Sequence, residues 1–184
     1  MYRENVEALK RAGEVVFFSP LRDKSLPEAD MVYFPGGYPE LHLAELAANE
    51  GMRQSVRKYC ENGGRVLAEC GGMMYLCDTI TDGDGKVYPM AGVLKQGATM
   101  EQMKLKLGYR EVRVNGQRIR GHEFHYSRIL PTNEKIPVIG TIYNAKDMVV
   151  DTPVYTYKNV LASYIHFYWG ECGIDHFLML MSQK

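Results

Sequence analysis

Residues 65–76 read RVLAECGGMMYL, and this stretch decides the fold that the sequence predicts. An apolar run at residues 66–68 precedes Cys70, and two glycines and a second apolar run follow it. The pattern predicts a buried strand, a sharp turn and a helix, with Cys70 at the turn. A cysteine in this setting is either a small core residue or a nucleophile held at the tip of the turn.

The residues around Cys70 meet the steric requirement of a nucleophile elbow. An elbow has a small residue two positions before and two positions after the nucleophile, because its strained turn brings neighbouring backbone close. Ala68 and Gly72 occupy these two positions. We expect the N–H groups of the following helix to lower the pKa of the thiol and to bind a developing oxyanion. A buried cysteine at a strand end, with Gly-Gly simply making the turn, stays an alternative.

The segments on either side of this stretch alternate between helical and extended patterns. The apolar spacing predicts helices at 4–12, at 41–62 with an interruption near Gly51, and at about 171–181, and strands at 14–18 (EVVFF) and 31–34 (MVYF). Alternation of this kind predicts one α/β domain with a parallel sheet covered by helices on both faces.

The second half of the chain changes to strand patterns joined by short turns. YREVRV at 109–114 and QRIRGHEF at 117–124 flank Asn115-Gly116. Asn-Gly is a strong hairpin signal, because a type I′ turn needs positive φ at both central positions. A second hairpin is predicted around Lys158-Asn159, so antiparallel pairing follows the parallel part of the sheet.

Two further motifs belong at the same edge of the sheet as Cys70. Gly36 and Gly37 follow the strand at 31–34, and the carboxyl edge of an α/β sheet is where ligands bind. Paired glycines there can present backbone N–H groups to an oxyanion, although a plain turn is an alternative. His166 ends a strand-like run and fits a Cys/His pair assembled by the fold, or else it is a satisfied structural histidine.

GHEFHYS, at residues 121–127, is the last motif with chemically active side chains. We expect His122 and His125 to face one side of a strand and Glu123 to face the other. His122-x-x-His125 is a loose metal spacing, and no third ligand accompanies it, so the sequence predicts no metal site.

Composition excludes several other classes of protein. Lys plus Arg and Asp plus Glu number 22 each, so the zero net charge offers no general attraction for nucleic acid or an anionic membrane. No apolar run approaches the roughly 20 residues of a membrane span. The four cysteines have no metal spacing, and no signal peptide opens the chain, so we expect a cytoplasmic protein.

Together these motifs resemble the class I (triad) glutamine amidotransferase domain, and more narrowly the C-terminal domain of cobyrinic acid a,c-diamide synthase. The resemblance is carried by LPEADMVYFPGGYPELH, GGRVLAECGGMMYL, LGYREVRV, GHEFHYSRI and LASYIHFYW. It implies a flavodoxin-like doubly wound, mostly parallel sheet with late antiparallel hairpins, in a single domain over residues 1–184. It also implies that no cofactor is bound in this domain.

The resemblance assigns a role to each matching residue. Cys70 would attack the side-chain amide of glutamine, and His166 would act as its base and then protonate departing ammonia. Backbone N–H groups of Gly36, Gly37 and Gly71 would bind the oxyanion.

Two positions depart from the wider class I pattern. Tyr168 stands where many relatives carry the Glu that orients the histidine, so Glu123 or Glu171 is a candidate for that role. Met74 stands where many relatives carry a Gln, which implies a different detail of glutamine recognition.

The resemblance also implies a partner. In the family, ammonia passes to an N-terminal ATP- and Mg²⁺-dependent synthetase domain that amidates the a and c carboxylates of a corrinoid. This sequence has no P-loop motif and therefore looks like the amidotransferase part alone. In the family a strand also precedes the helix at 4–12. We therefore predict either a gap between the strands at 14–18 and 31–34 or a compensating rearrangement.

Four other functions stay open at this point. The amidotransferase domains of cobyric acid synthase and nickel-sirohydrochlorin a,c-diamide synthase carry similar motifs. Another thiol hydrolase or isomerase on a related fold would share the elbow but not its flanking motifs. A non-enzymatic binding or regulatory domain would be favoured if Cys70 or His166 were absent, and both are present.

Overall fold

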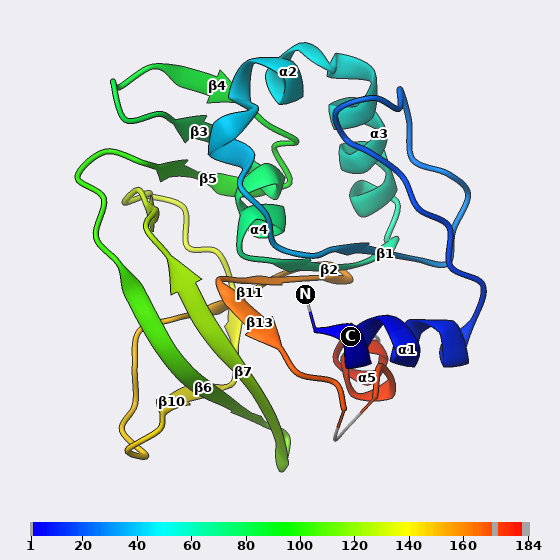
Figure 1. Ribbon diagram of the computed structural model, residues 1–184, viewed down its shortest axis with the longest axis vertical. Helices are drawn as coiled ribbons and strands as arrows, with labels where there is room; N and C mark the ends of the chain where they lie inside the picture. The colour runs from blue at the N-terminus through cyan, green and yellow to red at the C-terminus, as the bar shows by residue number, and fades with distance from the viewer. Residues whose placement is uncertain (1, 171–172, 182–184) are drawn as a thin grey trace.

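A computed structural model, which describes residues 2–170 and 173–181, confirms the α/β fold with a mixed central sheet (Figure 1). The strands of this sheet lie in the order β1 (Met31–Phe34), β2 (Arg65–Glu69), β12 (Val160–Ser163), β11 (Val154–Tyr157) and β9 (Val138–Ile139). β1 and β12 run parallel to β2 on its two sides, and β11 and β9 extend the sheet antiparallel.

Helices cover both faces of the central sheet, as the alternation predicted. η1 (Pro39–Leu41), α2 (Leu43–Ala48), α3 (Glu50–Glu61) and α4 (Gly71–Leu76) belong to one face, and α1 (Arg3–Ala12) and α5 (Asp175–Met181) lie on the other (Figure 1). β2 separates the two cores: Val66 and Ala68 belong to one buried cluster and Leu67 to the other. This division follows from the alternation of side chains along a strand.

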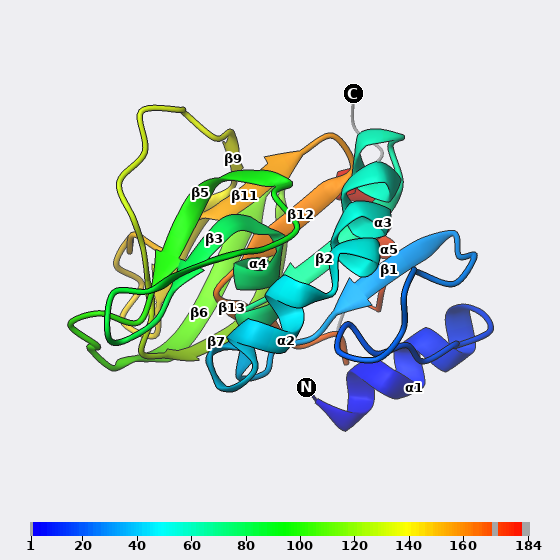
Figure 2. The ribbon, with the colours of Figure 1, turned by 90° about the horizontal axis from the view of Figure 1, so that it is seen from above.

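Two four-stranded sheets flank the carboxyl end of the central sheet (Figures 1 and 2). One has the order β4 (Val87–Pro89), β3 (Cys77–Thr81), β5 (Leu94–Thr99) and β8 (Arg128–Ile129). The other has the order β10 (Thr141–Asn144), β6 (Lys106–Val114), β7 (Gln117–His125) and β13 (Ile165–Phe167).

Both predicted hairpins are confirmed. β6 and β7 pair around Asn115 and Gly116, whose φ angles are 50° and 75°, as a type I′ turn requires. β11 and β12 pair around a turn in which Lys158 has a φ of 49°.

The strand expected at residues 14–18 does not form. Residues 14–18 are irregular, and Val16 and Phe17 are 55% and 79% exposed. Among the described residues, β1 pairs only with β2, and a cavity of about 820 Å³ lies beside its other edge. A cavity thus lies between residues 14–18 and β1, as the resemblance predicted, but only one of the two strands expected to border it forms.

Two of the three predicted helical regions differ slightly from the helices in the structure. The interruption in the helical region falls at Asn49 rather than Gly51, because the Asn49 side chain accepts a hydrogen bond from the Met52 N–H and caps α3. The last helix begins at Asp175, and residues 171–172 lie outside the described part of the chain. No helix within residues 2–170 or 173–181 has the length and apolarity needed to cross a membrane.

Candidate active site

Cys70 lies at the tip of a tight turn between β2 and α4. Its φ of 48° and ψ of −110° are a strained conformation for a residue with a side chain. The Cys70 N–H donates a hydrogen bond of 2.7 Å to the Ser163 carbonyl, which ties the turn to the end of β12. Strand, strained cysteine and helix together are the geometry of a nucleophile elbow.

The glycines after Cys70 are required by close packing. A Cβ at Gly72 would lie 2.5 Å from the carbonyl oxygen of Phe34, and a Cβ at Gly71 would lie 2.6 Å from that of Gly37. No side chain fits at such distances. The turn is therefore pressed against the loop that follows β1, and Gly37 and Gly71 are brought together as the sequence predicted.

His166 reaches the same place from a different sheet. Ser163, the last residue of β12, pairs with Glu69 at the end of β2, and the chain then leaves the central sheet to form β13. His166 lies in β13, and a Cβ at Gly36 would lie 2.1 Å from its Cε1 atom. The structure thus gathers Cys70, His166, Gly36, Gly37 and Gly71 at one edge of the central sheet.

Among the described residues, no hydrogen bond joins the Cys70 thiol to His166. The Cys70 thiol instead lies 3.8 Å from the carbonyl oxygen of Phe124. Burial raises the pKa of the Cys70 thiol to about 11, although a hydrogen bond with the Gly71 backbone opposes this shift. The expectation of a lowered pKa is therefore wrong, because desolvation of the thiolate outweighs the helix N–H group. The resting thiol is protonated at neutral pH and needs a base.

Glu123, proposed as an orienting carboxylate, is engaged elsewhere. Its fully buried carboxylate pairs with the Arg110 guanidinium at 2.7 Å and accepts a hydrogen bond of 2.9 Å from the Thr152 hydroxyl. Glu123 pairs with Ile165 across β7 and β13, so its side chain faces away from the His166 side of that sheet. The other candidate, Glu171, lies outside the described residues.

The arrangement of the GHEFHYS motif also needs correction. His125 Nε2 lies 2.7 Å from a Glu123 carboxylate oxygen, so these two residues share a face of β7. His122 lies on the opposite face and stacks on His166 with ring centroids 4.9 Å apart. The two histidines are separated by an odd number of positions, which places them on opposite faces of a strand. In the described part of the chain, no group of three or more His, Cys, Asp or Glu side chains is placed to hold a metal ion.

Glu69 was missed by the sequence analysis, although it stands next to Cys70. Its side chain is fully buried, and one carboxylate oxygen lies 3.7 Å from His166 Nδ1. The sequence feature that could have identified Glu69 is its charged side chain at the end of an otherwise apolar strand. Buried charges are uncommon and need a specific partner.

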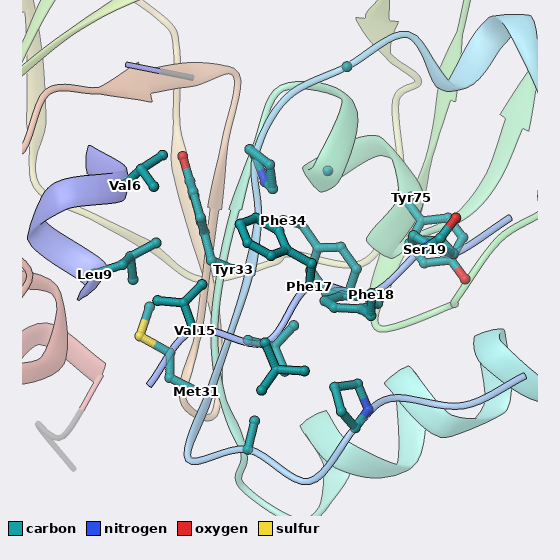
Figure 3. A pocket seen from close by; sticks show the side chains of 18 of the residues that line it. Val6, Leu9, Val15, Phe17, Phe18, Ser19, Met31, Tyr33, Phe34 and Tyr75 are labelled. Atoms are coloured by element: carbon teal, nitrogen blue, oxygen red, sulfur yellow. The ribbon is translucent and has the colours of Figure 1, made fainter. Parts of the chain in front are cut away.

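The cavity beside β1 reaches the glycine loop but does not surround the cysteine. Figure 3 shows Val6 and Leu9 of α1 facing Met31 and Tyr33 of β1 across it, with Val15 between them. Its far end is lined by the loop at residues 35–39 and by Gly71 and Gly72.

Comparisons with known proteins agree with this geometry. A solved structure described as "Crystal structure of glutamine amidotransferase" superimposes with a TM-score of 0.64 and 25% identity, and the match covers 98% of this chain and 94% of that chain. Fold and site thus define a glutamine amidotransferase domain. Residues 1–173 match the model of the CobB/CobQ-like glutamine amidotransferase domain, and the chain belongs to this family of enzymes.

Curated relatives show which glutamine amidotransferases this chain is similar to. The chain is 39% identical to hydrogenobyrinate a,c-diamide synthase of Pseudomonas aeruginosa over 91% of its own length. It is 35% identical to cobyrinate a,c-diamide synthase of Salmonella typhimurium over 92% of its length. The chain spans only 38% and 39% of these two relatives, so each of them contains a large part that this chain does not match.

Proposed function

We propose that this chain hydrolyses glutamine through a Cys70 thioester and supplies the ammonia that amidates the a and c carboxylates of a cobyrinic-type corrinoid in cobalamin biosynthesis. The observation that carries the chemistry is the strained Cys70 turn, which packs against the glycine loop at the sheet edge that also holds His166. The names of the curated relatives support the choice of substrate.

In the first half of the reaction, His166 takes the thiol proton and the sulfur attacks the side-chain amide carbon of glutamine. The resulting oxyanion accepts hydrogen bonds from backbone N–H groups of the Gly36-Gly37 loop and of Gly71. The close approach of the Gly37 backbone to Gly71 supports this role, because it puts the two segments side by side. The carbon–nitrogen bond then breaks, His166 returns its proton, and ammonia leaves.

In the second half, water hydrolyses the glutamyl thioester. His166 takes a proton from the water, the hydroxide attacks the thioester carbon, and the carbon–sulfur bond breaks. The proton returns to the Cys70 sulfur and glutamate leaves. The sum is glutamine plus water giving glutamate plus ammonia.

The amidation itself needs a second catalytic unit. Amide formation from a free carboxylate and ammonia requires activation of the carboxylate, and this chain has no P-loop motif to bind ATP. We therefore place ATP and Mg²⁺ in a synthetase domain that accompanies this one. The large unmatched part of the curated relatives is consistent with such a domain.

The test uses a protein in which this chain is joined to its synthetase domain. We expect Cys70→Ser to abolish glutamine-dependent amidation and to retain amidation driven by free ammonia, because only the glutaminase step needs the thiol. Cys60→Ala is the matched control, since Cys60 is a buried cysteine of α3 with no place in the site. Undiminished glutamine-dependent amidation by Cys70→Ser would overturn the proposal.

A further inference from the structure

We propose that Glu69 positions the imidazole of His166 and stabilises its protonated form, and this inference rests on the proposed glutaminase reaction. A Glu69 carboxylate oxygen, Oε2, lies 3.7 Å from His166 Nδ1. The Glu69 side chain is fully buried and that of His166 is 12% exposed. Nδ1 of His166 is itself buried and has no hydrogen-bond partner among the described residues, and it faces the carboxylate across a short gap.

The carboxylate of Glu69 is held in place from two other directions. Its Oε1 atom accepts a hydrogen bond of 3.1 Å from the N–H of Phe167, the residue after His166. Its Oε2 atom accepts a hydrogen bond of 2.7 Å from the Tyr33 hydroxyl of β1. Burial and the nearby Glu69 raise the pKa of Tyr33, which keeps that hydroxyl a donor. Glu69 therefore connects the end of β1 to the strand that carries the histidine.

The backbone around His166 is fixed by a buried side chain of α1. Asn5 donates a hydrogen bond of 2.7 Å to the Phe167 carbonyl and accepts one of 3.0 Å from the Trp169 N–H. With Glu69 bonded to the Phe167 N–H, both backbone polar groups of Phe167 are occupied. The imidazole is consequently held on a rigid strand, which is what a positioning carboxylate needs.

The other face of the imidazole is covered by a second histidine. The His122 ring stacks on His166 at an interplanar angle of 18°, and His122 Nδ1 lies 2.6 Å from the Tyr2 hydroxyl. Burial, and secondarily the proximity of His166, lower the pKa of His122. Among the described residues, the titratable groups that contact His166 are Glu69 at the end of β2 and His122 of β7, and Tyr33 of β1 contacts Glu69 in turn. Glu69 is the carboxylate among them.

Glu69 acts when His166 takes the thiol proton. The imidazole then becomes an imidazolium, and its Nδ1–H points at the negative charge of a fully buried carboxylate. A carboxylate in this place favours the imidazolium and fixes the ring orientation, as the third member of a catalytic triad does. Its position differs from that of Tyr168, where many class I relatives carry a Glu. In this chain the carboxylate precedes the nucleophile instead of following the histidine.

The experiment measures glutamine hydrolysis over a range of pH in the protein that joins this chain to its synthetase domain. Glu69→Gln nearly preserves the size of the side chain and removes the charge. Its amide oxygen can still accept from the Phe167 N–H, and its NH2 group takes the place of Oε2 beside the Tyr33 hydroxyl. We expect kcat to fall about 10- to 1,000-fold with little change in KM, because the imidazolium loses its stabilising charge. We expect the acidic limb of the kcat/KM profile to move to lower pH for the same reason.

Three further variants separate positioning from a general structural effect. Glu123→Gln neutralises another fully buried carboxylate that does not contact His166, and it leaves the acidic limb in place. Tyr33→Phe removes one hydrogen bond to Glu69 but keeps the charge, so kcat stays within about tenfold of the parent. Glu69→Asp keeps the charge at a longer distance and retains the acidic limb, which makes the test possible even if Glu69→Gln folds poorly.

The outcomes distinguish this inference from the function on which it rests. If Cys70→Ser is inactive with glutamine while Glu69→Gln keeps the parental kcat and acidic limb, the role of Glu69 is overturned and the glutaminase function stands. If Cys70→Ser remains active with glutamine, the proposed function itself fails. An unfolding midpoint of Glu69→Gln in urea close to that of the parent shows that the variant is folded.

Discussion

The two neighbouring parallel strands β1 and β2 lie in very different surroundings. β2 is paired on both sides, and its residues Val66, Leu67 and Ala68 are fully buried between two helical layers. β1 is paired on one side among the described residues, and beside its other edge lie a cavity and the irregular residues 14–18. The difference shows that pairing on both sides, more than apolar sequence, decides how completely a strand of this sheet is buried.

The proposed catalytic groups are divided between these two strands. Cys70 and Glu69 sit at the end of β2, where packing leaves no room for a methyl group at Gly72. The glycine loop at residues 35–39 follows β1 and lines the cavity. The proposed nucleophile and its proposed positioning carboxylate therefore lie at the end of the strand that is paired on both sides, and the proposed oxyanion-binding loop follows the strand with one partner.

The largest expected effect that tests this comparison is on the stability of the elbow. In Gly72→Ala the new methyl group would overlap the backbone of Phe34, so the elbow or the loop after β1 must move. We expect the free energy of unfolding to fall by about 1–3 kcal/mol, as in other overpacked cores, measured by urea denaturation.

Gly83→Ala is the matched control for that substitution. Nothing lies within 4 Å of a Cβ at Gly83, so we expect its unfolding free energy to stay within about 0.5 kcal/mol of the parent. Equal losses for the two variants would show that the elbow is no more tightly packed than a surface turn.

A second prediction concerns the reactivity of the elbow thiol. Because burial raises the pKa of Cys70 to about 11, the thiolate fraction is small at pH 7 and grows as the pH rises. We expect the rate of alkylation by iodoacetamide to increase about tenfold per pH unit between pH 7 and 9. The measurement uses a Cys172→Ser background, because Cys172 lies outside the described residues.

Cys70→Ser in the same background reports the remaining thiols. Burial raises the pKa values of Cys60 and Cys77 to about 12, so their alkylation is slower at every pH in that range. A rate for Cys70 that stays level between pH 6 and 8 would contradict the prediction, since it would show a thiolate already formed.

Features that depend on a few adjacent residues could be predicted from the sequence. Contacts that depend on the pairing of distant strands could not. The Cys70 elbow and the Asn115-Gly116 hairpin were predictable, because each depends on a few adjacent residues in a special conformation. The position of Glu69 against His166 was not, because it depends on the pairing of Ser163 with Glu69 and on the path of the chain into β13. Glu123 was considered instead, since a carboxylate within a histidine-rich motif gives a stronger local signal.

Residues 14–18 do not form the predicted strand, and a substitution there gives the smallest expected effect on the free energy of unfolding. EVVFF has the composition of a strand, but a strand needs a neighbour for its backbone N–H and C=O groups, and within residues 2–170 and 173–181 no strand pairs with these residues. Phe17 is 79% exposed, so little apolar contact is lost when it is replaced. We expect Phe17→Ser to change the unfolding free energy by less than about 0.5 kcal/mol in urea denaturation. A loss as large as that of Gly72→Ala would mean that residues 14–18 pack against the domain in solution, and the contrast between the two strands would fail.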